Sequence, residues 1–162
     1  MVKALLQRVS QASVIVDGET VGSIRHGLLI LVCAVSGDTG HTATQLAHKI
    51  ANLRIFEDSD GKMNRSVLER NENRPTALVI SQFTLAADAR KGRRPSFVEA
   101  ARPEQAIPLL EQFCLALEAC GVATETGIFG AHMEVALVND GPVTIWLDSD
   151  DLFGSPASGA SR

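Results

Sequence analysis

Two short polar segments carry the residue types that could do chemistry, and the first of them directly follows an apolar run. It consists of Ser81, Gln82, Phe83 and Thr84. Polar side chains at the end of a core strand must be hydrogen-bonded or directed into a cleft, because burial without a partner is unfavourable. The segment is therefore either the half-buried end of an alternating strand or part of a site, and its spacing alone leaves both open.

The second polar segment lies near the end of the chain and contains the residue types of a tight turn. It runs Asn139-Asp140-Gly141-Pro142-Val143-Thr144. Asn, Asp, Gly and Pro favour turns, each through its own backbone or side-chain geometry. The segment is either a turn that joins two strands or a functional loop, and we keep both interpretations.

Other signatures of chemistry are missing from the sequence. The chain contains no nucleophile elbow, no phosphate-binding Gly-Lys loop and no dinucleotide-binding glycine pattern. Its three cysteines have no Cys or His partner at metal-ligand spacing, and we interpret them as buried reduced thiols. Of the four histidines, His132 follows a turn, and we expect the others to be surface residues. We therefore expect no metal and no cofactor.

These segments must be positioned by a fold that 162 residues can form as one domain with its own core. We predict a single domain over residues 1–150 and a disordered tail over residues 151–162. Apolar spacing predicts two helices, one over residues 42–53 and one that Pro103 opens and Gly121 closes. About seven strands are expected, chiefly at residues 2–9, 12–16, 28–35, 77–85, 122–126, 133–138 and 143–147, with hairpin turns at 17–18 and 57–62. This pattern indicates an α+β domain with a mostly antiparallel sheet.

The formal net charge of −4 argues against a general nucleic-acid binder that works by global positive charge. The basic residues are unevenly spread, however, since Arg90, Lys91, Arg93 and Arg94 fall within five positions after the first polar segment. This cluster is either a solvated charged loop or a local lip for an RNA partner. The longest apolar run is too short for a membrane helix and no signal peptide is visible, so we expect a cytoplasmic protein without a membrane partner.

Both polar segments resemble the signature motifs of the D-aminoacyl-tRNA deacylase family. Further matching stretches are Leu6-Gln7-Arg8-Val9, Asp17-Gly18, Leu85-Ala86-Ala87-Asp88, Lys91-Gly92, Arg94-Pro95-Ser96-Phe97 and Gly127-Ile128-Phe129-Gly130-Ala131. The resemblance implies a barrel-like antiparallel sheet flanked by two helices, in a homodimer. It also implies hydrolysis of the ester between a D-amino acid and the 3′-terminal ribose of tRNA, which is chiral proofreading in translation. A related family that removes L-alanine from a threonine tRNA has Pro-Gln in place of Ser81-Gln82, and this favours the D-specific branch.

The resemblance assigns roles to the residues of the first motif. The Gln82 side chain and the Phe83 backbone N–H would donate hydrogen bonds to the carbonyl or oxyanion, while Ser81 and Thr84 would orient the pocket. Covalent catalysis through Thr84 would need an adjacent base, and the sequence supplies none. We therefore expect non-covalent hydrolysis, assisted by the 2′-hydroxyl of the terminal adenosine.

The second motif is implied to bind the substrate of the partner subunit. In the family the Gly-Pro pair, here Gly141-Pro142, is a cis element that holds the substrate's α-amino group and leaves no room for an L side chain. The other implied substrate-binding residues lock this loop, belong to it or line the adenosine pocket: Arg8, Asn139, Val143, Thr144, Phe129 and Ala131. Exclusion of this kind implies broad acceptance of D side chains, and hydrolysis of glycine mischarged on alanine tRNA. His132 departs from the Asp expected in many relatives.

Two other functions remain open at this point. A non-catalytic dimer that holds RNA 3′ ends would use the same basic cluster and turn motifs. A small-molecule hydrolase would use Thr84 or Ser81 as its nucleophile. Release of amino acid from D-tyrosyl-tRNA but not from L-tyrosyl-tRNA would separate the deacylase from both.

Overall fold

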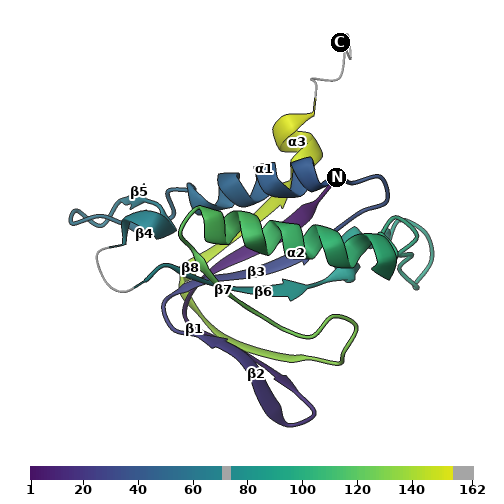
Figure 1. Cartoon of the computed structure of the whole chain (residues 1–162), viewed down its shortest axis with the longest axis horizontal. Coiled ribbons are helices and arrows are strands. Elements are labelled where there is room, and N and C mark those ends of the chain that lie inside the picture. Colours follow the sequence, from purple (N-terminus) through teal and green to yellow (C-terminus); the bar gives the residue numbers. More distant parts are fainter. Residues whose placement is uncertain (71–73, 155–162) are drawn as a thin grey trace.

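The computed structural model describes residues 1–70 and 74–154, which form a curved sheet with helices packed against one face (Figure 1). In chain order the elements are β1 (Lys3–Val16), β2 (Glu19–Ile24), β3 (Gly27–Cys33), α1 (Gly40–Ala51), β4 (Phe56–Glu57), β5 (Met63–Arg65), β6 (Thr76–Ser81), α2 (Pro103–Ala119), β7 (Ala123–Thr126), β8 (Glu134–Asp148) and α3 (Ser149–Phe153). Short 3-10 helices form at Val67–Glu69 and Phe83–Ala86.

Strand β1 organises the main sheet, because β2, β3 and β8 all pair with it in antiparallel orientation. The strand order is β2-β1-β3-β6-β7, and β8 also pairs with β1. The β3–β6 and β6–β7 pairs are parallel, since α1 and α2 are the crossover connections that parallel neighbours require. The expected α+β fold with a mostly antiparallel sheet is confirmed.

The sheet curls so far that β2 approaches β7, which gives it a nearly closed, barrel-like form. At the approach a Cβ atom on Gly22 would lie 2.7 Å from the carbonyl oxygen of Thr126, so only glycine fits without a shift. Inside the curl a cluster of buried side chains, including Val14, Leu29 and Leu78, fills the space. The barrel-like arrangement implied by the family resemblance is therefore present.

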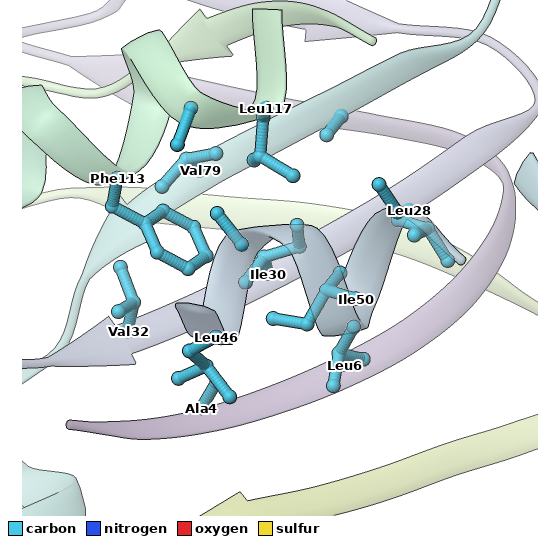
Figure 2. Packing of buried hydrophobic residues seen from close by; sticks show 14 of the residues in the cluster. Ala4, Leu6, Leu28, Ile30, Val32, Leu46, Ile50, Val79, Phe113 and Leu117 are labelled. Carbon is cyan, nitrogen blue, oxygen red and sulfur yellow. The ribbon is translucent and has the colours of Figure 1, made fainter. Parts of the chain in front are cut away.

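Strand β3 is buried on both faces, as its continuous apolar run predicts. Its even-numbered residues, such as Leu28 and Ile30, face α1 and α2 in the main core, where Figure 2 shows them beside Ile50 and Phe113. Leu29 of the same strand lies in the cluster inside the curl. Strand β3, which pairs with β6, is thus packed on both faces. Because β6 ends at Ser81, this packing fixes the place of the first polar motif.

Both predicted helices form, and their ends follow from capping residues. The Thr39 side chain accepts a hydrogen bond from the Thr42 N–H at the start of α1. Pro103 stands at the first position of α2, where its missing N–H is harmless, and Gly121 with φ +98° follows the end of that helix.

A third helix, α3, was not predicted. It begins where the Asp148 side chain accepts a hydrogen bond from the Asp150 N–H. Residues 151–153, which we assigned to a disordered tail, belong to this helix. The tail from residue 155 onward lies outside the described residues.

Two predicted strand breaks are wrong, one between residues 9 and 12 and one between residues 138 and 143. The strands expected over residues 2–9 and 12–16 are parts of one strand, β1, which begins at Lys3, and those expected over residues 133–138 and 143–147 are parts of one strand, β8, which begins at Glu134. The reason is that β1 and β8 pair with each other along their length, with register shifts between Gln7 and Gln11 instead of chain reversals. The strand expected over residues 77–85 is shorter than predicted, because β6 ends at Ser81.

Candidate active site

The first polar motif marks the point where β6 stops and the chain turns into a 3-10 helix. Ser81 is the last strand residue and pairs with Val32 of β3. The Gln82 N–H donates to the Val32 carbonyl oxygen at 2.8 Å, which extends that pairing by one bond. The Gln82 side-chain amide donates to Thr84 Oγ1 at 2.5 Å. The motif is therefore the end of a strand with a hydrogen-bonded polar turn, and not an alternating strand.

Two backbone N–H donors at the start of this turn are left without an acceptor in the described part of the chain. The first N–H groups of any helix lack partners within the helix. Among the residues that the structure describes, nothing accepts a hydrogen bond from the N–H of Phe83 or Thr84. These amides can therefore donate to a ligand, which is the arrangement that stabilises a developing oxyanion.

A groove of about 570 Å³ opens beside the motif, and several predicted site residues line it. Ser81, Gln82 and Phe83 contribute from the motif, while Phe129, Ala131 and His132 contribute from the connection between β7 and β8. The Phe83 side chain is 58% exposed, so its ring face is available for stacking against a planar group. The volume and the mix of aromatic and polar groups suit a small organic moiety.

Sequence reasoning missed part of the groove wall. Phe97, Ala101 and Pro103 line it from the segment that precedes α2. The Phe97 ring meets the Phe83 ring edge to face, with centroids 5.2 Å apart and planes at 77°. Phe97 belongs to a stretch that matched the family motif, but its position in the sequence did not predict a contact with Phe83.

Cys33 lies beneath the motif and supports the same turn. Its thiol contacts the Phe83 carbonyl oxygen at 3.6 Å and the Ala34 carbonyl oxygen at 3.3 Å. Burial raises the pKa of Cys33 to about 11, so at neutral pH the group is a protonated thiol and can act as a donor. This agrees with the buried thiol expected at Cys33 and gives no nucleophile for the groove, whereas Cys114 and Cys120, also expected to be buried, are only partly buried because they lie at the edge of the main core.

The second polar motif is an excursion within the β1–β8 ladder. Val9 pairs with Asn139 and Gln7 pairs with Thr144, so four residues of β8 stand opposite Arg8 alone. The Asn139 side chain spans the excursion, because its oxygen accepts from the Val143 N–H at 2.8 Å and its nitrogen donates to Thr144 Oγ1 at 3.1 Å. The motif is therefore a braced loop within one strand.

Arg8 holds this loop from the other strand, as the family resemblance implies. Its Nε donates to the Asp140 carbonyl oxygen at 2.9 Å, and its Nη1 donates to the Ile55 carbonyl oxygen at 2.8 Å. The Arg8 guanidinium is buried, whereas its two acidic neighbours, Glu57 and Asp140, are more than half exposed at 3.5 and 3.6 Å. The Gly141–Pro142 peptide bond in the loop is cis, as in the family pattern.

The two motifs do not meet within one chain. Arg8, which holds the loop, pairs with Leu28 of β3, whereas Ser81 pairs with Val32 at the far end of that strand. Four residues of strand separate these positions, about 13 Å along its axis. None of the residues of the second motif lines the groove beside Phe83. One chain therefore brings the first motif together with Phe129 and Ala131, but keeps Gly141 and Pro142 elsewhere.

Within residues 1–70 and 74–154, no group of three or more His, Cys, Asp or Glu side chains could hold a metal ion. No helix in the same part of the chain is long and apolar enough to cross a membrane. The polar groups of the groove are the Ser81 hydroxyl, the Gln82 side-chain amide, the His132 imidazole and backbone amides, which can position and polarise a substrate.

Comparison with known proteins agrees with the motifs. The family model described as D-Tyr-tRNA(Tyr) deacylase matches residues 5–148. A curated D-aminoacyl-tRNA deacylase of Thermomicrobium roseum is 63% identical over 152 residues, which cover 94% of this chain and 97% of the relative. Another of Roseiflexus castenholzii is 57% identical and covers 99% of both chains.

Two solved structures are similar over most of the chain. One, described as c-Myc DNA Unwinding Element Binding Protein, is 38% identical with a TM-score of 0.81 and covers 96% of this chain and 99% of its own. The other, described as a probable eukaryotic D-amino acid tRNA deacylase, covers 90% and 98% with a TM-score of 0.77 at 16% identity, and it supports the fold alone. The match of the family model over residues 5–148, together with the high identity to the curated relatives, means that the chain belongs to the D-Tyr-tRNA(Tyr) deacylase family.

Proposed function

We propose that this protein hydrolyses the ester bond of D-aminoacyl-tRNA and releases free tRNA and the D-amino acid. The observation that carries the proposal is the groove in which Ser81, Gln82 and the exposed Phe83 ring meet Phe129. Beside it lie two backbone amides for which residues 1–70 and 74–154 supply no acceptor. The groove is large enough for the terminal adenosine, with Phe129 and Ala131 as its wall. The proposed place of action is the cytoplasm, where charged tRNA is found.

The proposed chemistry is non-covalent. The Phe83 N–H and the Gln82 amide stabilise negative charge on the ester oxygen, while the 2′-hydroxyl of the substrate assists the attacking water. Thr84 is a poor nucleophile here, because its hydroxyl is engaged by the Gln82 amide and no base among the described residues contacts it. Ser81 and Thr84 then serve to orient the pocket.

The proposed site is completed by a second copy of the chain, whose Gly141-Pro142 loop enters the groove. Support comes from the separation of the two motifs within one chain and from a partly exposed apolar strip on the sheet face away from the helices. In that strip Leu5 stands directly opposite both Leu31 and Trp146, and Trp146 is 46% exposed. Apolar groups grouped in this way on a sheet face favour association, and a two-fold dimer would present two equivalent sites.

The loop is proposed to select D substrates by exclusion. Its backbone carbonyl groups hold the α-amino group, and Asn139, Val143 and Thr144 keep the loop in shape through the bonds that brace it. An L side chain would clash with the loop, whereas any D side chain would point away from it. Glycine has no side chain to exclude, so glycyl-tRNA mischarged on alanine tRNA is a proposed substrate as well.

The decisive experiment follows amino-acid release from D-tyrosyl-tRNA, L-tyrosyl-tRNA and glycyl-tRNA. Release from the D and glycyl substrates but not from the L substrate would support the proposal. Release from none of them would favour a protein that only binds RNA 3′ ends, and equal release from D and L would favour a general esterase. Thr84→Ala should keep measurable activity, and an acyl group trapped on Thr84 of the wild type would overturn the non-covalent route.

Complementation tests the cross-subunit site. Gln82→Ala removes a donor from the groove, and Gly141→Val places a side chain where a Cβ would already lie 2.9 Å from Val143 and 3.0 Å from Arg8. Each variant alone should be inactive. Refolded together, they should form mixed dimers with one intact site and recover about a quarter of the wild-type activity, by random pairing into two-fold dimers. No recovery in demonstrably mixed dimers would mean that each chain builds its own site.

A further inference from the structure

The basic cluster of the sequence lies on a closed hairpin, which we call the basic hairpin and define as residues 88–96. Its ends are joined by two backbone hydrogen bonds between Asp88 and Ser96, of 2.8 and 2.9 Å. Gly92, with φ +69°, allows the turn at its tip. The basic side chains are therefore carried by a defined projection of the backbone.

One of its four cations is neutralised and three are not. Arg90 donates to both carboxylate oxygens of Asp88, at 2.8 and 2.7 Å, and this pair holds the pKa of Asp88 down at about 2. Lys91, Arg93 and Arg94 are exposed, and no carboxylate of residues 1–70 or 74–154 lies within ion-pair distance of them. Three unpaired positive charges thus gather on a chain whose net charge is −4.

The basic hairpin is attached to the groove at both of its ends. Its first arm follows the 3-10 helix that begins with Phe83, and its second arm leads into Phe97, whose ring contacts the Phe83 ring. Both rings line the groove. Figure 1 shows the connection between β6 and α2, which includes the basic hairpin, on the same side of the molecule as the connection between β7 and β8.

The other border of the groove is unsuited to phosphate. A second cleft of about 580 Å³ shares Ser81 and Phe129 with the groove and runs along α2. Its wall includes Glu111 and Glu118, and the Glu118 carboxylate accepts a hydrogen bond from Thr124. A polyanion that ends in the groove would be repelled from this acidic side and attracted to the basic hairpin.

We infer that Lys91, Arg93 and Arg94 bind the phosphates of the unpaired 3′ end of tRNA, next to the terminal nucleotide that occupies the groove. This inference rests on the proposed function and adds the surface that recognises the rest of the RNA. Phosphate contacts of this kind release counterions, so they give affinity that falls with salt and carries no sequence preference. The tip of the hairpin, four residues from its base, reaches at most about 13 Å beyond the groove rim, which suits the phosphates nearest the 3′ end.

The test compares two substrates in a triple variant, Lys91→Ala/Arg93→Ala/Arg94→Ala. On D-tyrosyl-tRNA, kcat/KM should fall about 10- to 100-fold at moderate salt, and the plot of log kcat/KM against log salt should become shallower by about 2 units, the expectation for three single-strand phosphate contacts. On the D-tyrosyl ester of adenosine, which lacks those phosphates, kcat/KM should stay within about twofold of wild type.

A matched control removes three exposed cations from other parts of the surface, Arg25→Ala/Lys49→Ala/Lys62→Ala, with the same change in net charge. It should behave nearly as the wild type on both substrates. If the control loses as much as the triple variant, or if the triple variant keeps the wild-type salt slope on tRNA, the inference is overturned and the basic hairpin is only a solvated loop.

Direct binding of uncharged tRNA tests the phosphate-binding surface separately from the proposed hydrolysis. A wild type that cleaves neither substrate, but binds tRNA with a salt slope that the triple variant lacks, would refute the proposed hydrolysis and support the phosphate-binding surface. A wild type that cleaves both substrates while the triple variant binds tRNA equally well would support the hydrolysis and refute the surface.

Discussion

Replacing Arg8 with methionine should destabilise the protein by about 3 kcal/mol. Methionine keeps most of the apolar volume but removes the donors to the carbonyl oxygens of Ile55 and Asp140. Leaving a buried acceptor without its charged donor costs about 1–3 kcal/mol, and two acceptors are affected. The exposed carboxylates of Glu57 and Asp140 add little, since ion pairs at such sites contribute about 0–1 kcal/mol.

Two further variants sharpen this prediction. Arg8→Lys keeps the charge but can reach only one of the two carbonyl oxygens, so its loss should be about half as large. Arg25→Met makes the same chemical change at an exposed position and should alter the free energy of unfolding by less than about 0.5 kcal/mol.

The assay is equilibrium unfolding in urea, followed by the fluorescence of Trp146, the single tryptophan of the chain. Trp146 lies in β8 a few residues beyond the loop that Arg8 holds, so it reports on the affected strand. All variants are compared at one protein concentration, because association would make stability concentration-dependent. A loss below about 1 kcal/mol for Arg8→Met, or equal losses for the Met and Lys variants, would refute the view that two carbonyl contacts hold the loop.

Three other outcomes follow from the structure. The carboxyl group of Asp88, which accepts hydrogen bonds from Arg90, should titrate near pH 2 by NMR. Because its pKa is lowered in the folded state, the ion pair is complete above about pH 4 and is lost as the pH falls through about 2. A titration of Asp88 near pH 4 would contradict this. Cys33 and Cys114, both with pKa raised to about 11 by burial, should react with iodoacetamide in the native protein far more slowly at pH 8 than near pH 11, as peptide mass spectrometry would show. Gly22→Ala should lower stability by about 1–3 kcal/mol in urea unfolding, because its Cβ would press on a backbone carbonyl, and an unchanged midpoint would mean that the curl of the sheet opens freely there.

Much of the fold could be predicted because its signals are local. The two long helices were identified from their apolar spacing and their capping residues, and the Asp17-Gly18 turn from its dipeptide, which has positive φ at both positions. The continuity of β1 and β8 could not be predicted, because it depends on the pairing of residues more than a hundred positions apart. The turn-forming residues of β8 indicated that the strand ends at residue 138. The strand continues beyond them because β8 pairs with β1 on both sides of the loop.

The site divides in the same way. Ser81, Gln82 and Phe83 were identified by polar residues placed after a core strand, and they do line a groove with Phe129 and Ala131. The contact of Phe97 with Phe83 and the contact of Arg8 with the Ile55 carbonyl oxygen are different in kind. Each joins segments whose proximity exists only in the folded chain, and one partner of the second contact is a backbone atom that carries no residue-type signal.

The excursion opposite Arg8 also lets one strand serve two separate cores. Before the excursion, Val135 and Leu137 pack on the cluster inside the curl of the sheet. After it, Leu147 lies in the main core under the helices, and Ile145 packs against that core. Successive side chains of an uninterrupted strand alternate between faces, so four odd-numbered residues of one regular strand would all face the same core. The loop is therefore the point at which β8 passes from lining one core to lining the other.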